Sequence, residues 1–216
     1  MASTLYTETY HSMTYENIPE KAMKVFELIS DHGFKVYFIG GCVRDMVMGI
    51  EPKDWDMCCN AKPDELAALF NENGIKIDPT GFEFGTVVAD FDEEKYEVCT
   101  FGEGTDIKDN AICRDFSMNA LAYNPIECKI YDYTGGIEDI KNKIIRSNGD
   151  PYENFCNDPF RIIRAIRFSL EFGFSIEEKT YQTMLDNYHL LANARSTRIT
   201  REVGKILKYA EHIFRK

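Results

Sequence analysis

A short apolar segment that runs directly into two glycines restricts this chain more than any other part of its sequence. Residues 34–39 read FKVYFI, which is typical of a buried strand. Gly40 and Gly41 follow at once, and residues 42–49 then have the composition of a helix that ends at Gly49. Glycine lets backbone N–H groups approach an anion closely, and a helix N-terminus adds a partial positive charge. The order of strand, glycine pair and helix therefore predicts a phosphate-binding turn.

Patterns on either side of this turn predict a mixed sheet followed by helices. The expected helices cover about 19–32, 62–73, 109–123, 158–172, 177–188 and 198–214, and the expected further strands 53–59, 85–91, 95–101 and 129–133. An acidic turn joins two of these strands into a hairpin. Because no flexible linker interrupts the chain, we expect an α+β fold, with a mixed-sheet domain over residues 1–136 that continues directly into helices over 137–216.

Composition and charge exclude several classes of protein. A chain of 216 residues with 44% hydrophobic side chains is too long and too apolar for disorder or a small disulfide scaffold. Its net charge of −11 restricts any nucleic-acid contact to a local region. Residues 186–216, with seven basic and three acidic side chains, are the best candidate, although a solvated helix face is the commoner explanation.

Cysteine and histidine usage favours a reduced protein without structural zinc. The seven cysteines form no C-x-x-C pair, and the four histidines are scattered. The first 21 residues are polar and lack the apolar run of a secretory signal, and no apolar stretch in the sequence is long enough to span a bilayer. We therefore expect a cytoplasmic protein with no membrane partner.

Asp54 and Asp56 are the first candidates for catalysis, because residues two apart on a strand point to the same face. At roughly 6.6 Å along the backbone, their carboxylates can share divalent ions about 4 Å apart. Glu97 on the hairpin is a candidate third carboxylate, and Arg44 could hold a triphosphate. Simpler explanations stay open: strand acids often face solvent, and Arg44 could pair with Asp45 or Asp54.

A polar cluster at the start of the helix expected over 109–123 has the chemistry to hold a nucleotide. Asp115 and Asn119 are spaced to share one helix face, where they could hydrogen-bond a ribose. Arg114 could reach a phosphate from the same place. Taken alone, such a cluster more often caps a helix.

A charged stripe runs along the helix expected over 158–172. Its members lie at intervals of three: Asp158, Arg161, Arg164 and Arg167. Three like charges on adjacent turns repel, which makes sense if an anion or a base lies against them. Aspartate accepts from amino groups and arginine donates in a fixed fork, so the pair could read a base edge without a nucleic-acid template. A salt-bridged solvent face is the competing interpretation, weakened by the single acid in the stripe.

Four blocks in this order resemble the bacterial-type (class II) tRNA nucleotidyltransferases and related poly(A) polymerases of the polymerase β superfamily. The blocks are GGCVRDMVMGIEPKDWDM, CRDFSMNALAY, YDYTGGIEDI and NDPFRIIRAIRFSLEFGF, and the resemblance covers about residues 38–174. It implies a polymerase β-like head followed by a helical neck and the start of a body. It also implies addition of CMP and AMP to the tRNA 3′ end, in which the terminal hydroxyl attacks the α-phosphate of CTP or ATP and pyrophosphate leaves.

The resemblance implies a role for each matched residue. Asp54 and Asp56 are similar to Mg²⁺ ligands, and Gly41 and Arg44 to triphosphate contacts. Arg114 matches a nucleotide contact, and Asp115 matches a contact to the ribose. Asp158 and Arg161 resemble the amino-acid template for the base, and Arg164 and Arg167 bind nucleotide beside them.

Four features differ from the family pattern. The family usually has a longer segment between the E-V-x-T strand and the R-R-D segment, whereas only GEGTDIKDNAI joins them in this chain. A short connection at this place resembles the enzymes that add only the two cytidines. Cys113 stands where an arginine is usual, and Asn157 where the template helix carries glutamate. The chain ends near the start of the tRNA-binding body, which implies weak tRNA binding, self-association as a homodimer, or another target.

Two other functions stay open. Nucleotide could pass to another acceptor, such as a different RNA or a protein side chain. Alternatively, the chain could be a catalytically idle nucleotide- or RNA-binding module, although a retired site has no reason to keep the repulsion between Asp54 and Asp56.

Overall fold

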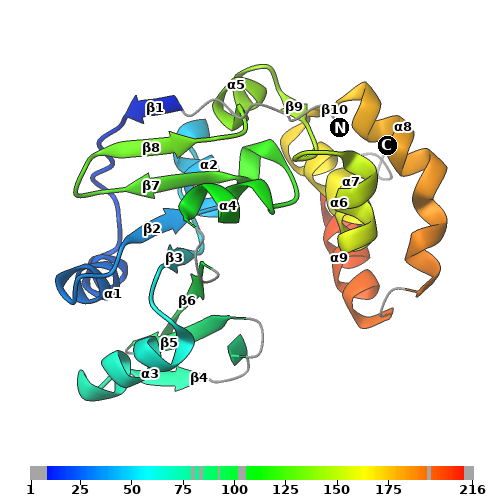
Figure 1. Cartoon of the computed structure of the whole chain (residues 1–216). Coiled ribbons are helices and arrows are strands. Elements are labelled where there is room, and N and C mark those ends of the chain that lie inside the picture. Colours follow the sequence, from blue (N-terminus) through cyan, green and yellow to red (C-terminus); the bar gives the residue numbers. More distant parts are fainter. Residues whose placement is uncertain are drawn as a thin grey trace. The chain divides into compact units, whose positions relative to one another are not determined.

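The computed structural model describes residues 9–78, 81–82, 85–91, 93–101, 106–193 and 196–211. The chain forms two compact units (Figure 1). Residues 6–112 and 119–134 make up the sheet unit, and residues 1–5, 113–118 and 135–216 make up the helical unit. The change of unit at 134–135 lies near the domain boundary that we expect at residue 136, whereas the short segment 113–118 groups with the later helices.

The described part of the sheet unit contains one mixed sheet with the strand order β1-β8-β7-β2-β3-β6-β5-β4. The strands are β1 (Thr9–Ser12), β2 (Val36–Ile39), β3 (Met57–Cys59), β4 (Lys76–Asp78), β5 (Thr86–Phe91), β6 (Glu94–Thr100), β7 (Leu121–Asn124) and β8 (Lys129–Asp132). Among these strands, β3 and β6 pair in parallel and the other neighbours pair antiparallel. The mixed sheet and the β5–β6 hairpin predicted from the sequence are confirmed.

The helices of the sheet unit are α1 (Glu20–Asp31), α2 (Gly41–Met48), α3 (Pro63–Glu72) and α4 (Ile107–Ile112). The helical spacing of α1 buries Ala22, Val25, Phe26 and Ile29. Phe26 stacks on Phe38 of β2 with ring centroids 5.1 Å apart. This contact ties α1 to the strand that leads into the glycine pair.

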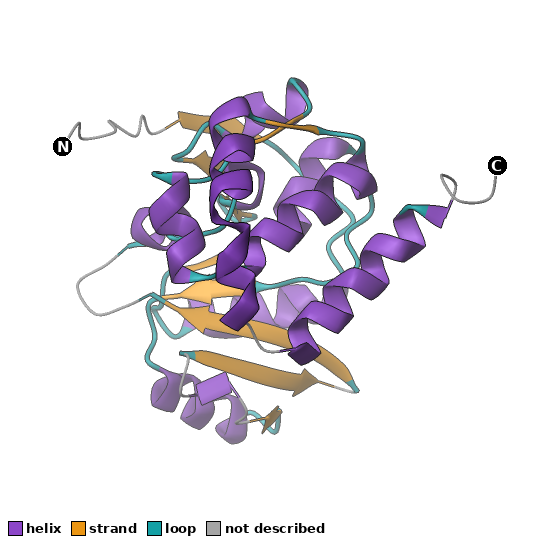
Figure 2. Cartoon of the chain, turned by 90° about the vertical axis from the view of Figure 1, so that its right-hand side faces the viewer, coloured by secondary structure: helices purple, strands orange, loops and turns teal. Residues whose placement is uncertain are grey.

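The helical unit consists mainly of short helices (Figure 2). In the described ranges they are α5 (Gly136–Lys141), α6 (Pro151–Asn157), α7 (Phe160–Phe172), α8 (Glu178–Asn187) and α9 (Ser196–Tyr209), with a 3₁₀ segment at Tyr188–Asn193. Two short strands, β9 (Ile144–Ile145) and β10 (Ser175–Ile176), pair in parallel. The sequence predicted only helices in this region, and these two strands differ from that prediction. No helix in the described ranges is long and apolar enough to cross a membrane.

Three element boundaries differ from the sequence-based expectation. The single helix predicted over 109–123 is wrong: α4 ends at Ile112, a 3₁₀ turn covers Ser117–Asn119, and β7 follows. Leu121–Asn124 form a strand because they hydrogen-bond between β2 and β8, and tertiary pairing outweighs local helix propensity. The helix expected from residue 158 begins at Phe160, and the last helix ends at Tyr209, while residues 212–214 lie outside the described residues.

Candidate active site

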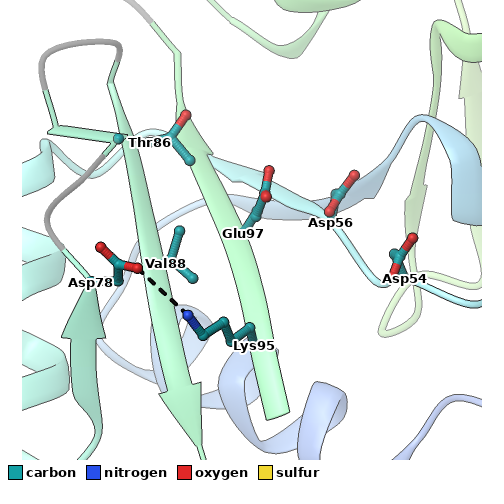
Figure 3. Close-up of a pocket in the computed structure, with 8 residues that line it drawn as sticks. Asp54, Asp56, Asp78, Thr86, Val88, Lys95 and Glu97 are labelled. Atoms are coloured by element: carbon teal, nitrogen blue, oxygen red, sulfur yellow. Dashed lines mark ion pairs between the residues drawn. The ribbon is translucent and has the colours of Figure 1, made fainter. Parts of the chain in front are cut away.

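A pocket of about 690 Å³ opens on the sheet unit around the predicted catalytic carboxylates (Figure 3). Its lining residues are Asp54, Asp56, Asp78, Gly81, Thr86, Val88, Lys95 and Glu97. Four of these eight carry carboxylates and one carries an amine, so the pocket has a negative charge. A free triphosphate would be repelled here unless a cation accompanied it.

Asp54 and Asp56 are held by the buried residue between them. Trp55 is only 6% exposed and packs edge-on against Phe38, with ring centroids 5.2 Å apart. The backbone oxygen of Asp56 accepts a hydrogen bond from the Ile39 N–H at 3.0 Å. These contacts leave Asp54 exposed and Asp56 half-buried, both facing the pocket.

The predicted strand over 53–59 is only partly correct, because β3 begins at Met57. Asp54 and Asp56 lie in the extended segment just before β3. The alternation of exposed, buried and half-buried side chains through Asp54, Trp55 and Asp56 nevertheless follows the pleat of a strand. Asp54 and Asp56 therefore line the same pocket although they precede the strand, and the convergence of their carboxylates on shared ions stays a prediction.

Glu97 reaches the same pocket through the sheet register. Met57 of β3 is paired with Val98 of β6, so the residues just before them, Asp56 and Glu97, are neighbours across the two strands. Val98 is fully buried, which turns Glu97 to the opposite face. Figure 3 shows the carboxylates of Asp54, Asp56 and Glu97 pointing to the same side.

The donor chemistry of this pocket fits a divalent cation such as Mg²⁺. Mg²⁺ prefers carboxylate and phosphate oxygens and commonly takes only one or two protein carboxylates, with water and substrate phosphates completing its shell. Asp54 and Asp56 supply such a pair. No group of three or more His, Cys, Asp or Glu side chains in the described part of the chain is arranged to hold a metal. The role of Glu97 as a metal ligand therefore stays a prediction.

The glycine pair has the backbone geometry that the sequence predicts. Gly40 has φ 74° and ψ −124°, a conformation that essentially only glycine adopts, and it immediately precedes α2. Its N–H donates to the Leu121 oxygen at 3.0 Å, which fixes the turn against β7. Gly41 begins α2, and a Cβ there would lie 3.7 Å from Arg44 Nη2.

Replacing Gly40 with alanine should destabilise the turn by about 1–3 kcal/mol, because a Cβ makes this φ and ψ costly. Gly49→Ala at the other end of α2 is the matched control, since Gly49 has φ 70° with open space around it. Urea unfolding measures both free energies of unfolding. If Gly40→Ala lowers the free energy of unfolding no more than Gly49→Ala does, the turn has no specific need for glycine at residue 40.

Arg44 is buried beside the glycine pair and binds two side chains. Its Nε and Nη2 donate to Asp45 Oδ1 at 2.8 and 2.6 Å, and its Nη1 donates to Asn119 Oδ1 at 2.8 Å. The simpler explanation left open by the sequence, a pair with Asp45, is thus present. These bonds hold the guanidinium at the start of α2, and its contact with a triphosphate stays a prediction.

Asp115 and Asn119 do not share a helix face as predicted, because no helix connects them. Asp115 is buried in the helical unit, where Arg164 Nη2 lies 2.6 Å from its Oδ2. Asn119 belongs to the sheet unit, where it accepts the bond from Arg44. Arg114 is half-buried, and its backbone oxygen accepts from the side chain of Asn148 at 3.1 Å.

The arginines of α7 have acceptors that the stripe itself does not contain. Arg161 Nη2 donates to the Cys113 oxygen at 2.8 Å, and Arg164 pairs with Asp115. Although burial opposes the charge of Arg164, the Asp115 carboxylate raises the pKa of this guanidinium. Repulsion along the stripe is therefore relieved within the protein, and it does not by itself require a bound anion.

Arg167 is the most buried of the three arginines of α7. Its Nε donates to Glu202 Oε2 of α9 at 2.7 Å, and its Nη1 pairs with Glu171. The side chains of Arg167 and Glu202 are 8% and 7% exposed. This geometry gives Arg167 a structural role, and its contact with nucleotide stays a prediction.

The Arg167–Glu202 pair should make the helical unit sensitive to acid. Burial opposes ionisation of Glu202, but Arg167 outweighs burial and lowers the pKa of this carboxyl below its ordinary value of 4.5. A carboxyl with a lowered folded-state pKa contributes stability above its unfolded pKa and loses it as the pH falls through the folded value. The stability advantage of wild type over Glu202→Gln, measured by urea unfolding, should therefore shrink as the pH falls below 4.5. An advantage that grew with acid would contradict this assignment.

Two charged residues that line the pocket, Lys95 and Asp78, were missed by sequence reasoning. Lys95 Nζ lies 3.5 Å from Asp78 Oδ2, as the dashed line in Figure 3 marks. Lys95 is two residues before Glu97 on β6, so the two-residue period of a strand could have placed it on the same face. Asp78 had no such local signal, because the three-residue strand β4 is too short to recognise.

Comparison with curated proteins finds relatives that are about twice as long. The chain is 37% identical over 201 residues to the CCA-adding enzyme of Lactobacillus helveticus (strain DPC 4571), covering 86% of this chain and 49% of that protein. It is 38% identical over 204 residues to the CCA-adding enzyme of Geobacillus sp. (strain WCH70), covering 88% and 49%. The chain thus spans about half the length of the curated relatives it matches.

Solved structures show the same relationship. The crystal structure of the Bacillus stearothermophilus CCA-adding enzyme in complex with CTP matches with a TM-score of 0.80 and 34% identity, over 87% of this chain and 48% of that one. The Thermotoga maritima CCA-adding enzyme complexed with tRNA matches with a TM-score of 0.79 and 26% identity, over 92% and 51%.

Two family descriptions match the sequence. Residues 173–213 match the probable RNA and SrmB-binding site of polymerase A. Residues 36–146, more than half of the chain, match the poly A polymerase head domain, and they contain the glycine turn and all three candidate catalytic carboxylates. The chain therefore belongs to the poly A polymerase head domain family, as its resemblance to the tRNA nucleotidyltransferases and poly(A) polymerases implied.

Proposed function

We propose that this chain is a template-independent nucleotidyltransferase that adds CMP, AMP or both to the 3′ end of tRNA and releases pyrophosphate. One observation carries the proposal: Asp54, Asp56 and Glu97 face one pocket of a sheet whose strand β2 runs directly into the glycine turn. Family membership and the CCA-adding relatives, with structures in complex with CTP or tRNA, support the choice of substrates.

Asp54 and Asp56 would hold Mg²⁺ in this pocket. Bound there, the metal supplies positive charge that polarises the α-phosphate and favours ionisation of the attacking hydroxyl. The two carboxylates fix where that charge lies, because Trp55 anchors the backbone between them. Since the pocket lining is itself negative, it favours a nucleotide that arrives with its cation over a free triphosphate.

The remaining residues position the nucleotide. Gly40 and Gly41 leave the start of α2 without side chains, so backbone N–H groups there can donate to triphosphate oxygens. Arg44 would add a charge-assisted hydrogen bond from the same turn. In the helical unit, Asp158 would accept from the amino group of cytosine or adenine while Arg161 donates to the same base edge. Positioning and electrostatics then account for catalysis with little covalent chemistry by the protein.

We place the reaction in the cytoplasm. All seven cysteines are free, including Cys113 and Cys156, which are exposed. Free exposed thiols persist in a reducing compartment. Self-association as a homodimer is a separate expectation from the sequence, and it stays a prediction.

The direct test offers labelled CTP or ATP, with Mg²⁺, to tRNAs that lack one, two or all three terminal nucleotides. We expect incorporation, and product length on a sequencing gel will separate addition of CC, A and CCA. An unstructured RNA of equal length is the control acceptor. Labelling of that RNA in preference to tRNA would assign another acceptor, and no incorporation with any acceptor would refute the proposal.

A further inference from the structure

The carboxylate that we propose to read the base is held by hydrogen bonds on both of its oxygens. Asp158 Oδ1 accepts from the Phe160 N–H at 3.1 Å. Asp158 Oδ2 accepts from Arg198 Nη2 of α9, also at 3.1 Å. One bond comes from the first turn of α7 and the other from a residue 40 positions along the chain. The carboxylate is thereby restricted to one orientation.

Arg198 is itself well placed to impose that orientation. Its guanidinium lies over the Phe160 ring, with its central carbon 3.8 Å from the ring centroid. Phe160 is buried, so the surface on which Arg198 stacks does not move freely. The helix that carries Arg198 is also attached to α7 through the buried Arg167–Glu202 pair. Arg198 thus connects a fixed aromatic ring to the Asp158 carboxylate.

The geometry still leaves Asp158 able to bind a ligand. The side chains of Asp158 and Arg198 are 30% and 48% exposed. A carboxylate has about four lone-pair sites, and the two bonds described use one site on each oxygen. Each oxygen therefore keeps acceptor capacity toward solvent. The exocyclic amino groups of cytosine and adenine are donors that can use it, whereas uracil presents an acceptor at the corresponding position.

We propose that Arg198 is a positioning residue for nucleotide selection: it orients the Asp158 carboxylate toward the amino group of the incoming base. This inference rests on the proposed function. Arg198 lies in the basic stretch of residues 186–216, which the sequence alone assigns to a phosphate backbone or a solvated face. The proposal explains why this arginine contacts a carboxylate instead. Removing Arg198 should free Asp158 to rotate and weaken discrimination between amino-bearing bases and uracil.

The test measures kcat and KM for CTP, ATP and UTP with wild type, Arg198→Ala and Arg198→Lys. Arg201→Ala is the matched control, because Arg201 is exposed on the same helix and its loss changes the charge equally. For Arg198→Ala we expect the preference for CTP over UTP in kcat/KM to fall about 10- to 100-fold through a higher KM for CTP. Lysine should restore only part of it, because an ammonium lacks the planar fork that stacks and donates together.

Unchanged discrimination in Arg198→Ala, or an equal loss in Arg201→Ala, would overturn the proposal. Thermal melting shows whether each variant is folded, and an equal fall in kcat for all three nucleotides would indicate a merely structural role. Calorimetric measurement of CTP and UTP binding without acceptor distinguishes failure of the proposed function from failure of the proposed role of Arg198. If wild type transfers no nucleotide but binds CTP over UTP through Arg198, the proposed transfer reaction fails, whereas selection of the base by Arg198 and Asp158 is supported. If wild type binds both nucleotides alike, this inference fails whatever the outcome with tRNA.

Discussion

Asp54→Asn should reduce nucleotide incorporation by about 1000-fold or more while leaving the folded state intact. The loss of one carboxylate from the pair removes several kcal/mol of charge stabilisation from the transition state, and about 4 kcal/mol corresponds to that factor. Asp54 is exposed, and three other acids line the same pocket. Its neutralisation relieves repulsion, so the melting temperature should stay the same or rise. Labelled incorporation and thermal melting measure the two effects.

The control for this experiment is Asp31→Asn at the exposed end of α1, which makes the same change in charge outside the pocket. It should retain wild-type incorporation. Undiminished incorporation by Asp54→Asn would show that the carboxylate pair takes no part in nucleotide transfer. A parallel loss in both variants would instead point to an effect of total charge.

Arg167→Met should lower the free energy of unfolding by about 3–5 kcal/mol. This change leaves the buried Glu202 carboxylate without its main partner, and an uncompensated buried charge is costly. Glu171 is less affected, because Tyr209 Oη donates to it at 2.6 Å and its side chain is 20% exposed. Urea unfolding at neutral pH provides the measurement.

A second substitution distinguishes lost pairing from lost packing. Adding Glu202→Leu to Arg167→Met should recover most of the stability, since apolar side chains often replace a buried ion pair at little cost. Lys205→Met is the surface control: Lys205 lies 3.7 Å from Glu202 but is half exposed, so its removal should cost less than about 1 kcal/mol. A double variant as unstable as Arg167→Met would show that packing by the arginine stem, and not its charge, is what α9 requires.

Local patterns in the sequence predicted much of the sheet unit correctly. The apolar spacing in α1 and the run of β2 into Gly40 are short-range signals, and both features are present. The position of Asp54 and Asp56 on one side also followed from the local pleat, although β3 begins at Met57, four residues after the expected start, and ends at Cys59 as expected. These features could be predicted because backbone conformation over a few residues determines them.

The partners of the charged residues could not be read from the same patterns. The stripe on α7 contains a single acid, so its arginines looked unsatisfied, yet Asp115 lies 49 positions from Arg164 and Glu202 lies 35 positions from Arg167. Likewise, Leu121–Asn124 became a strand only because β2 and β8 lie on either side of them.

The sequence by itself determined the glycine turn, the pleated acidic pair and the helix that carries the arginines, because each depends on neighbours within a few residues. Only the tertiary structure decided that Glu97 stands beside Asp56, that Arg44 is held by Asn119, and that Arg198 orients Asp158. Such contacts depend on how distant segments pack, since the strength of an ion pair or hydrogen bond is set by the distance and burial of its two groups.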